Sequence, residues 1–221
     1  MIPIYSNQRH DWRKIIKPLA SCGPFGSGII SLFGCNYQCP FCFAQKYSYM
    51  PLDKNHRRDF SCEEIAQAIV EWRKANPTSC YLQITGGEPI LNDLRTDEMV
   101  TALIQADSVA QSELRIIYQT NGSFIGKTNR IPASLSNLRS LRRTAILFEL
   151  SIKGTNLSEY AILSGSGKPE GFYDQCRAYW LLKGLISNNI SVVARLGCGH
   201  HRNTIHFVNP ESGCSMFLHE S

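Results

Sequence analysis

The chain has 221 residues, of which 43% are hydrophobic and 19% are charged, and its formal net charge is +5 at pH 7. This composition excludes a largely disordered chain and predicts a single domain with a substantial core. No apolar run is long enough to cross a bilayer, and the first ten residues lack the order of a signal peptide, so we expect a cytoplasmic protein without a membrane partner.

Apolar runs and amphipathic segments alternate along most of the sequence. Strands are predicted at 28–34, 79–85, 114–120, 145–152 and 190–196. Helices are predicted at 61–75, 93–107, 133–141 and 171–187. Ser61 and Glu64 have the spacing of a capping box at the start of the first helix. Strands that alternate with helices imply βαβ units, so the sequence predicts an α/β fold with a parallel sheet of about five units.

We expect one domain, residues 1–221, in three parts. Residues 1–27 contain three prolines and predict an irregular cover ahead of the first strand. Residues 28–196 carry the alternating pattern. Residues 197–221 include a possible last strand at 205–209, but no crossover helix fits before it, so this segment is predicted to be irregular or truncated.

Three cysteines follow the first predicted strand within eight residues, at Cys35, Cys39 and Cys42. Loops at the carboxyl ends of parallel strands are where α/β folds place their chemistry. Three thiolates would leave one iron of a four-iron cluster without a protein ligand, which favours a reactive cluster. The CxxxCxxC spacing differs from those of ferredoxins and of zinc ribbons. A zinc site and buried unligated thiols are the alternatives.

With this spacing the chain resembles the radical SAM superfamily, in which CxxxCxxC holds a [4Fe–4S] cluster and S-adenosylmethionine (SAM) chelates the fourth iron. The aromatic Phe41 before the last cysteine also fits that pattern. The resemblance implies a [4Fe–4S] cluster and SAM as cofactors, with Cys35, Cys39 and Cys42 as the metal ligands. It also implies a partial TIM barrel, (β/α)5–6, with parallel strands and one open side.

The second predicted strand runs directly into Gly86-Gly87-Glu88-Pro89. Taken alone, this motif is a turn in which glycines free the backbone and proline ends the strand. Its position matches the GGEP motif of radical SAM enzymes, which implies that these residues hold the amino group of SAM. An ammonium group needs acceptors around it, and glycines let the backbone approach closely.

The third predicted strand ends in Thr120-Asn121-Gly122. Taken alone, this motif is an Asn-Gly turn. The same motif is common in the branch that contains the glycyl-radical enzyme activases, and the resemblance implies that Thr120 and Asn121 contact SAM. Those activases usually carry Asp before the Thr, where this chain has Gln119.

Alternation along the fourth predicted strand places Glu149, Ser151 and Lys153 on one face and apolar residues on the other. Polar side chains inside an apolar strand are costly unless they are paired or solvated. Resemblance to the activases implies that Lys153 pairs with the SAM carboxylate, and that Ser151, which replaces an Asp, contacts the ribose or the carboxylate. With both Asp positions replaced, the metal-ion site of the activases is not implied here. A solvated lysine at the strand end is the alternative.

Three further features are less specific. Arg195 lies within the apolar fifth strand and needs an anion, for which a structural pair with Glu149 is favoured over a SAM or substrate carboxylate. The glycine-rich segment 164–168 lacks Walker order and predicts a flexible loop. Histidines and cysteines near the end of the sequence match no zinc pattern and have no defined role: Cys198, His200, His201 and Cys214.

The resemblance implies reductive cleavage of SAM to a 5′-deoxyadenosyl radical that abstracts hydrogen from a substrate, with an external one-electron reductant of the flavodoxin or ferredoxin type. The activase-like motifs favour a protein or peptide substrate. A radical SAM enzyme that acts on a small metabolite or RNA is the first alternative, and a non-catalytic iron–sulfur or zinc module is the second. Because the positive charge is modest and scattered, a nucleic-acid partner is not expected.

Overall fold

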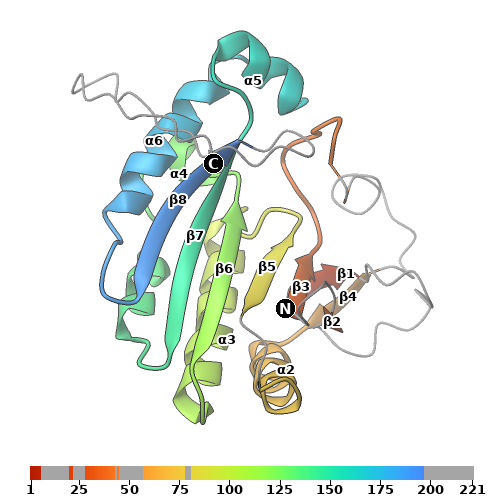
Figure 1. The fold of residues 1–221 in the computed structure, drawn as a ribbon. Helices are drawn as coiled ribbons and strands as arrows, with labels where there is room; N and C mark the ends of the chain where they lie inside the picture. Colours follow the sequence, from red (N-terminus) through yellow and green to blue (C-terminus); the bar gives the residue numbers. More distant parts are fainter. Residues whose placement is uncertain (6–19, 22–27, 43, 45–56, 78–80, 197–221) are drawn as a thin grey trace.

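The computed structural model describes residues 1–5, 20–21, 28–42, 44, 57–77 and 81–196 (Figure 1). Its centre is a parallel sheet of five strands, namely β3 (Gly28–Leu32), β5 (Leu82–Gly86), β6 (Leu114–Thr120), β7 (Thr144–Ile152) and β8 (Ile190–Leu196). The strands lie side by side in chain order. The predicted parallel α/β fold is therefore confirmed, and all five carboxyl ends meet at one edge of the sheet.

Three short strands extend this sheet beyond β3. They are β1 (Ile2–Tyr5), β2 (Ala20–Ser21) and β4 (Arg57–Phe60), and all of them pair antiparallel. The predicted irregular cover is thus wrong for 2–5 and 20–21. The physical reason is burial, because Ile2 and Phe60 enter the main core once β1 bridges β3 and β4.

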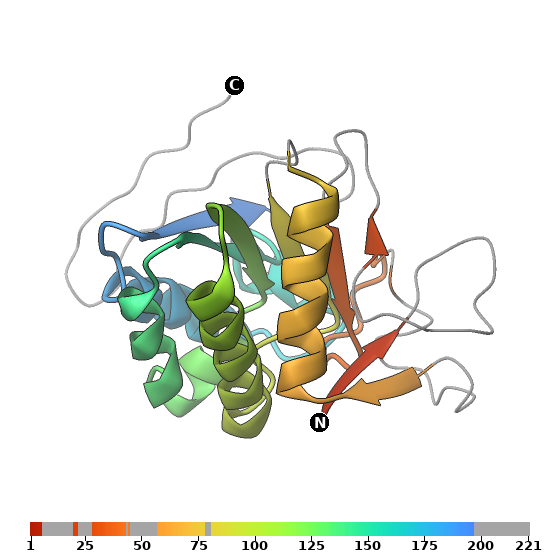
Figure 2. The same ribbon diagram turned by 90° about the horizontal axis from the view of Figure 1, so that it is seen from below.

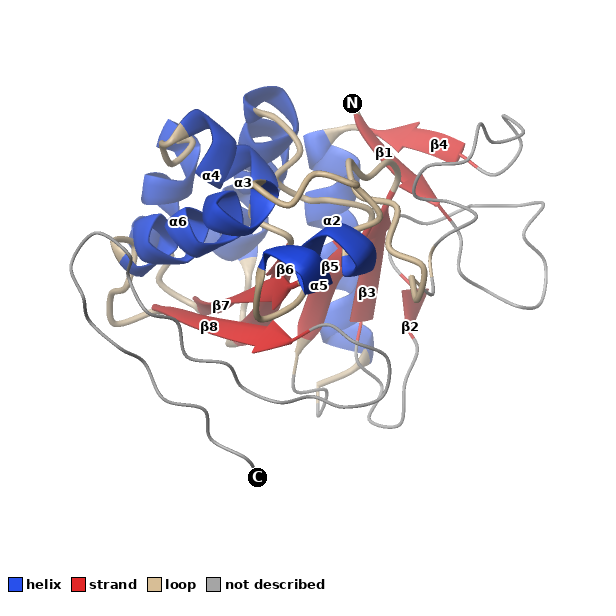
Figure 3. Cartoon of the chain, turned by 90° about the horizontal axis from the view of Figure 1, so that it is seen from above, coloured by secondary structure: helices blue, strands red, loops and turns tan. Residues whose placement is uncertain are grey.

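The main helices cover one face of the sheet (Figures 2 and 3). These are α2 (Cys62–Ala75), α3 (Asp93–Val109), α4 (Ser123–Thr128), the 3₁₀ helix η2 (Ala133–Ser140) and α6 (Gly171–Lys183). The short helix α5 (Leu157–Leu163) instead lies at the carboxyl edge of the strands. Among the described residues no helix is long and apolar enough to span a membrane.

The capping box predicted for the first helix is present. The Ser61 hydroxyl accepts a hydrogen bond from the Glu64 amide at 3.2 Å, and the Glu64 carboxylate accepts one from the Ser61 amide at 2.8 Å. Each partner satisfies an amide that the first turn of α2 leaves without an intrahelical acceptor. The sequence missed α4 and α5, which have six and seven residues and are too short to show a helical period.

Close packing fixes α4 against α6. A Cβ atom built on Gly126 would lie 1.8 Å from the Asp174 carbonyl oxygen, so the two backbones touch. Arg177 donates a hydrogen bond to the Gly126 carbonyl at 2.9 Å. Both helices therefore pack at this contact with no room for a side chain.

Strand β7 shows how the sheet divides its two faces. Phe148, Leu150 and Ile152 are fully buried in the main core, whereas Glu149 and Ser151 are half-buried on the face that the main helices leave open. This alternation was predicted. Within the described residues β4 and β8 form the two edges and do not pair with each other, so the sheet is open and consistent with a partial TIM barrel.

Candidate functional site

The cysteine loop, residues 33–42, leaves β3 at the carboxyl edge of the sheet. Cys35 and Cys42 are half-buried, and Cys39 is buried. The Cys42 amide donates to the Cys39 carbonyl at 3.0 Å, which closes a tight turn between the last two thiols. All three cysteines pack into one small apolar cluster, separate from the main core, with the aromatic residues Tyr37, Phe41, Tyr160 and Phe172.

Backbone hydrogen bonds join this loop to the turn after β5. The Gly87 amide donates to the Leu32 carbonyl at 2.7 Å, and the Glu88 amide donates to the Gly34 carbonyl at 2.8 Å. Gly87 must be glycine here, because a Cβ atom would lie 2.2 Å from the Gly34 carbonyl oxygen. Arg95 of α3 donates to the same Gly34 carbonyl and to the Glu88 carbonyl, at 3.3 and 3.1 Å. Hydrogen bonds and close packing therefore join the cysteine loop and the GGEP turn into one unit.

The Glu88 side chain links this unit to the turn after β6. It is 2% exposed, and its carboxylate accepts hydrogen bonds from the Thr120 hydroxyl, the Asn121 amide at 2.7 Å and the Ile90 amide at 2.9 Å. Burial raises the pKa of Glu88, against the opposing effect of these three hydrogen bonds and of Arg95. The carboxylate is thus an internal connector between two turns.

Contact of the GGEP turn with a SAM amino group stays a prediction. Because Glu88 and Pro89 are buried, the half-buried Gly86 and Gly87 are the parts of this turn closest to the surface. A ligand that reached the turn would meet backbone there, as the glycines allow.

Asn121 connects the β6 turn to the first cysteine. Its side-chain amide donates to the Asn36 side-chain carbonyl at 3.0 Å and approaches the Cys35 sulfur at 3.7 Å. Its own side-chain carbonyl accepts from the Ser123 amide at 2.9 Å, which shapes the start of α4. Thr120 and Asn121 therefore hold the β6 turn against Glu88 and the cysteine loop, and their contact with SAM stays a prediction.

Lys153 lies at the carboxyl end of β7 and faces the cysteine loop. Its side chain is nearly buried, with 8% exposure, which rules out the alternative of a solvated lysine. Its ammonium group donates to the Ser151 hydroxyl at 2.6 Å and lies 5.3 Å from the centre of the Phe41 ring. The Lys153 charge also lowers the pKa of Cys39, although burial of that thiol raises the pKa by more. A buried cation thus stands beside the cysteines.

The predicted structural pair of strand β8 is confirmed. The Arg195 guanidinium lies 3.2 Å from the Glu149 carboxylate, and the Gln119 side-chain amide donates to the other Glu149 oxygen at 2.9 Å. Gln119 and Ser151, which stand where the activases usually carry Asp, therefore bind Glu149 and Lys153.

One residue of this site was missed by the sequence analysis. Gln175 of α6 is fully buried, and its side-chain amide donates to the carbonyls of Asn121 and Ser151 at 2.8 and 3.1 Å. Its carbonyl accepts from the Lys153 amide at 3.0 Å. The available signal was its place on the buried face of α6, together with Ala178, Tyr179 and Leu182.

The surroundings of Cys35 fit a thiolate that ligates a cluster. The Tyr37 amide and the Asn121 side-chain amide both point at its sulfur, at 3.4 and 3.7 Å. Burial, together with the smaller effect of the Glu88 charge, raises the pKa of the Cys35 thiol to about 12. N–H donors aimed at a cysteine sulfur stabilise its ligated, deprotonated form and tune a cluster's potential.

Among the described residues, no three His, Cys, Asp or Glu side chains converge on a point where one metal ion would bind. A [4Fe–4S] cluster takes its cysteines on separate irons, so its ligands do not share one point. Three thiols on one loop, with N–H donors to the first, are the donor set that such a cluster requires.

The other cysteines lie in helices or outside the described residues. Cys62 and Cys176 sit in helices, where burial raises the pKa of Cys176 to about 11 and its thiol packs in the main core. The residues of the C-terminal prediction, Cys198, His200, His201 and Cys214, belong to the undescribed segment, as do Cys22 and Cys80.

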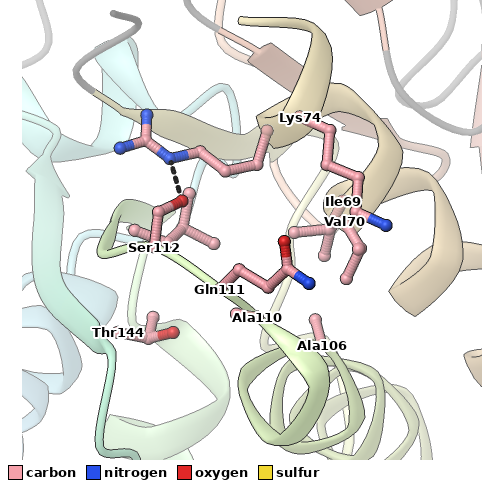
Figure 4. A pocket seen from close by; sticks show the side chains of 10 residues that line it. Ile69, Val70, Lys74, Ala106, Ala110, Gln111, Ser112 and Thr144 are labelled. Atoms are coloured by element: carbon pink, nitrogen blue, oxygen red, sulfur yellow. Dashed lines mark hydrogen bonds between the residues drawn. The ribbon is translucent and has the colours of Figure 1, made fainter. Parts of the chain in front are cut away.

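A pocket at the opposite, amino edge of the sheet contains none of the predicted site residues. It lies between the last turns of α2 and α3, where Arg73 donates to the Ser112 hydroxyl at 3.2 Å (Figure 4). Leu114 and Thr144, the first residues of β6 and β7, also line it. The cysteine site and this pocket therefore occupy opposite ends of the same strands.

The fold and the site together define a class. An open parallel α/β sheet that carries a CxxxCxxC loop and a GGEP turn at its carboxyl edge is typical of partial-barrel enzymes that use an iron–sulfur cluster. The chain belongs to the radical SAM superfamily, whose family model matches residues 29–176. Members of this superfamily use a [4Fe–4S] cluster and S-adenosylmethionine.

This chain is also similar to solved structures. One of them, native anSMEcpe with bound AdoMet and the Cp18Cys peptide, matches with 20% sequence identity and a TM-score of 0.43. The match covers 81% of this chain and 41% of that chain, so this chain spans less than half of the length of that protein. No curated protein matches the sequence.

Proposed function

We propose that this protein cleaves SAM reductively and uses the resulting 5′-deoxyadenosyl radical to abstract a hydrogen atom from its substrate. The [4Fe–4S] cluster, when bound, supplies the single electron that breaks the bond between sulfur and C5′ of SAM. We assign its ligands as Cys35, Cys39 and Cys42. One observation carries the proposal: the cysteine loop, the GGEP turn and the turn after β6 form a single hydrogen-bonded network at the carboxyl edge of the sheet.

The chain's own residues bind and orient SAM in this proposal. The backbone of Gly86 and Gly87 would accept hydrogen bonds from the SAM amino group. The Lys153 ammonium, held by the Ser151 hydroxyl and next to Phe41, would pair with the SAM carboxylate. Such a pair is strong in this place because Lys153 is nearly buried and water screens it little.

Thr120, Asn121, Glu88 and Pro89 would act mainly by holding these groups in place. Glu88 joins two turns, and Asn121 joins the second of them to Cys35. Positioning of this kind is a large part of what a protein adds to a cofactor that carries the difficult chemistry.

We propose a protein or peptide as the substrate. The Thr120-Asn121-Gly122 and Ser151-Ile152-Lys153 stretches support this choice, because they are similar to motifs of the activase-like branch. The open face of the sheet also supports it, since the main helices leave that face uncovered (Figure 3). A small metabolite or RNA is the alternative substrate.

The test is anaerobic reconstitution with iron and sulfide, followed by reduction with dithionite, addition of SAM and detection of 5′-deoxyadenosine by mass spectrometry. We expect product from the wild type and none from Cys39→Ala. Cys176→Ala is the matched control, because it removes a buried cysteine of α6 that packs in the main core, away from the cysteine loop. This variant should retain the activity. A wild type that binds no four-iron cluster would contradict the proposal.

A further inference from the structure

A row of aromatic rings leads from the cysteine loop to the surface. Tyr37, which stands between Cys35 and Cys39, contacts Tyr160 of α5 with ring centres 5.9 Å apart. Tyr160 contacts Phe172 at 6.5 Å, and Phe172 contacts Tyr173 at 6.0 Å, both at the start of α6. Each contact is edge-on, which is a favourable arrangement for aromatic pairs.

The two inner rings of this row are buried and the two outer rings are increasingly exposed. Tyr37 and Tyr160 are buried and share a hydrogen bond between their hydroxyl groups. Phe172 is half-buried, and Tyr173 is 47% exposed. The row therefore begins among the cysteines and ends in solvent without a gap between successive rings.

The backbone fixes this row to the cysteine loop. The Gln38 amide donates to the Ser164 carbonyl at 2.9 Å, in the connection between α5 and α6. Gly165 has φ +64° and packs so closely that a Cβ atom would lie 2.1 Å from the Gln38 carbonyl oxygen. The segment 164–168, predicted as a flexible loop, is thus partly bound to the cysteine loop. We call α5, this segment and the first turn of α6 the α5–α6 corner, which contains Tyr160 and Phe172.

We propose that the α5–α6 corner is the docking surface for the external one-electron carrier, and that the four rings form the packed path from that carrier to the cluster. The inference rests on the proposed function. One electron leaves the reduced carrier, which is oxidised by one electron, and the cluster gains it. No bond forms or breaks in the path, and the tyrosines stay neutral phenols because the electron tunnels through the packed rings.

The position of Tyr173 separates this surface from the SAM residues. Tyr173 precedes Gln175 by two residues, which places the two side chains on nearly opposite sides of α6. Gln175 faces Asn121, Ser151 and Lys153. A partner that contacted Tyr173 would therefore reach the cysteine loop from outside, while the open face of the sheet remains available to the substrate.

The surface also has the character of a transient redox interface. Such interfaces are small, and exposed aromatic residues commonly anchor them. Tyr173 supplies such an exposed ring at the end of the row. From a carrier docked at Tyr173, the row offers a path of rings in mutual contact as far as the cysteine loop.

The test compares two ways of reducing the reconstituted protein. Cluster reduction and 5′-deoxyadenosine formation are measured with dithionite, which needs no docking surface, and with photoreduced flavodoxin. For Tyr173→Ser we expect the flavodoxin-driven rate at subsaturating flavodoxin to fall about tenfold and the dithionite-driven rate to stay unchanged. Ile186→Ser is the matched control, since Ile186 is 48% exposed and lies at the amino edge of the sheet.

Two further variants test the path itself. Phe172→Leu removes a ring but keeps apolar volume, and it should lower the ratio of flavodoxin-driven to dithionite-driven rates. Tyr160→Phe keeps the ring and should leave that ratio unchanged. Equal ratios in the wild type, Tyr173→Ser and Phe172→Leu would overturn the inference. Loss of activity with dithionite in the wild type would instead overturn the proposed function, so the two failures are distinguishable.

Discussion

At each end of the parallel sheet, one buried carboxylate and one side-chain carboxamide bind several groups of neighbouring segments, but the segments they join differ. At the carboxyl edge, the Glu88 carboxylate collects three donors, and the Gln175 carboxamide holds three backbone groups. At the amino edge, the Asp107 carboxylate accepts from the amides of Arg142 and Arg143 and from the Thr144 hydroxyl, at 2.9, 2.9 and 2.7 Å.

The Asn189 side chain completes the second edge by donating to the carbonyls of Leu138, Leu141 and Thr144, at 2.9, 3.3 and 3.4 Å. Because the chemistry of the two edges is so similar, a buried and fully bonded carboxylate is no sign of a binding site in itself. The two edges differ in the segments that these side chains connect. Glu88 and Gln175 connect the loops that carry the cysteines and the proposed SAM residues, whereas Asp107 and Asn189 connect α3, η2 and β7.

The largest effect is expected from Gln175→Leu. This change leaves two carbonyls and one amide without partners in a fully buried place, which should lower the free energy of unfolding by about 3 kcal/mol. It should also raise the dissociation constant for SAM tenfold or more, because Asn121, Ser151 and Lys153 lose their common support. Urea unfolding and calorimetric SAM titration measure the two effects.

Asn189→Leu is the matched change at the amino edge. It should lower stability as well, by about 2 kcal/mol, and leave the SAM affinity of the folded protein unaltered. An equal loss of SAM affinity in both variants would show that the two edges are not functionally distinct.

A smaller effect is expected from Glu88→Gln. The amide keeps the shape of the side chain but turns an NH₂ group toward one of the three donors, so we expect a loss of about 1–2 kcal/mol in stability and weaker SAM binding. Asp107→Asn makes the same change at the other edge and should reproduce only the loss of stability. The measurement is the SAM affinity of both variants at matched cluster content. Weaker SAM binding in both variants would show that the carboxylates of the two edges have the same role.

The pH dependence of stability tests the same carboxyl group without a change of its shape. Because burial raises the pKa of Glu88 above its ordinary value of 4.5, the folded state holds this proton longer than the unfolded state. The contribution of Glu88 to stability should therefore be fully present below pH 4.5 and fall as the pH rises from there toward the raised pKa of the folded state, with a slope of at most about 1.4 kcal/mol per pH unit. Subtracting the unfolding free energies of Glu88→Gln from those of the wild type, from about pH 5 to about pH 8, isolates this slope. A difference that rises with pH would contradict it.

The sequence predicted the parallel sheet because each of the five strands is a local apolar run with its own helix. It also predicted that the cysteines, the GGEP turn and Lys153 lie at one edge of the sheet, since the carboxyl ends of parallel strands meet there. It missed β1 and β4, whose pairing joins Ile2 to Phe60 across a long stretch of chain. Pairing of that kind depends on tertiary burial and leaves little trace in a four-residue segment.

The side-chain network of the site was harder to predict than its location. The resemblance implied that Glu88 helps to hold the SAM amino group, and in the structure its carboxylate accepts hydrogen bonds from three protein donors. The Glu149–Arg195 pair was predictable because both are charged residues on one face of adjacent apolar strands. Gln175 had no such partner in the sequence, since its three contacts are backbone groups from other elements.

The touching backbones of α4 and α6 have a consequence for mutational tolerance. Gly126 lies far from the cysteines in sequence and has no chemical group to offer, yet even alanine there would push against the Asp174 carbonyl. Gln175 is the next residue along α6, so the displacement would be passed directly to the backbone that carries it. In a saturation mutagenesis scan, Gly126 should therefore rank with the site residues in its intolerance, although it is only a spacer between two helices.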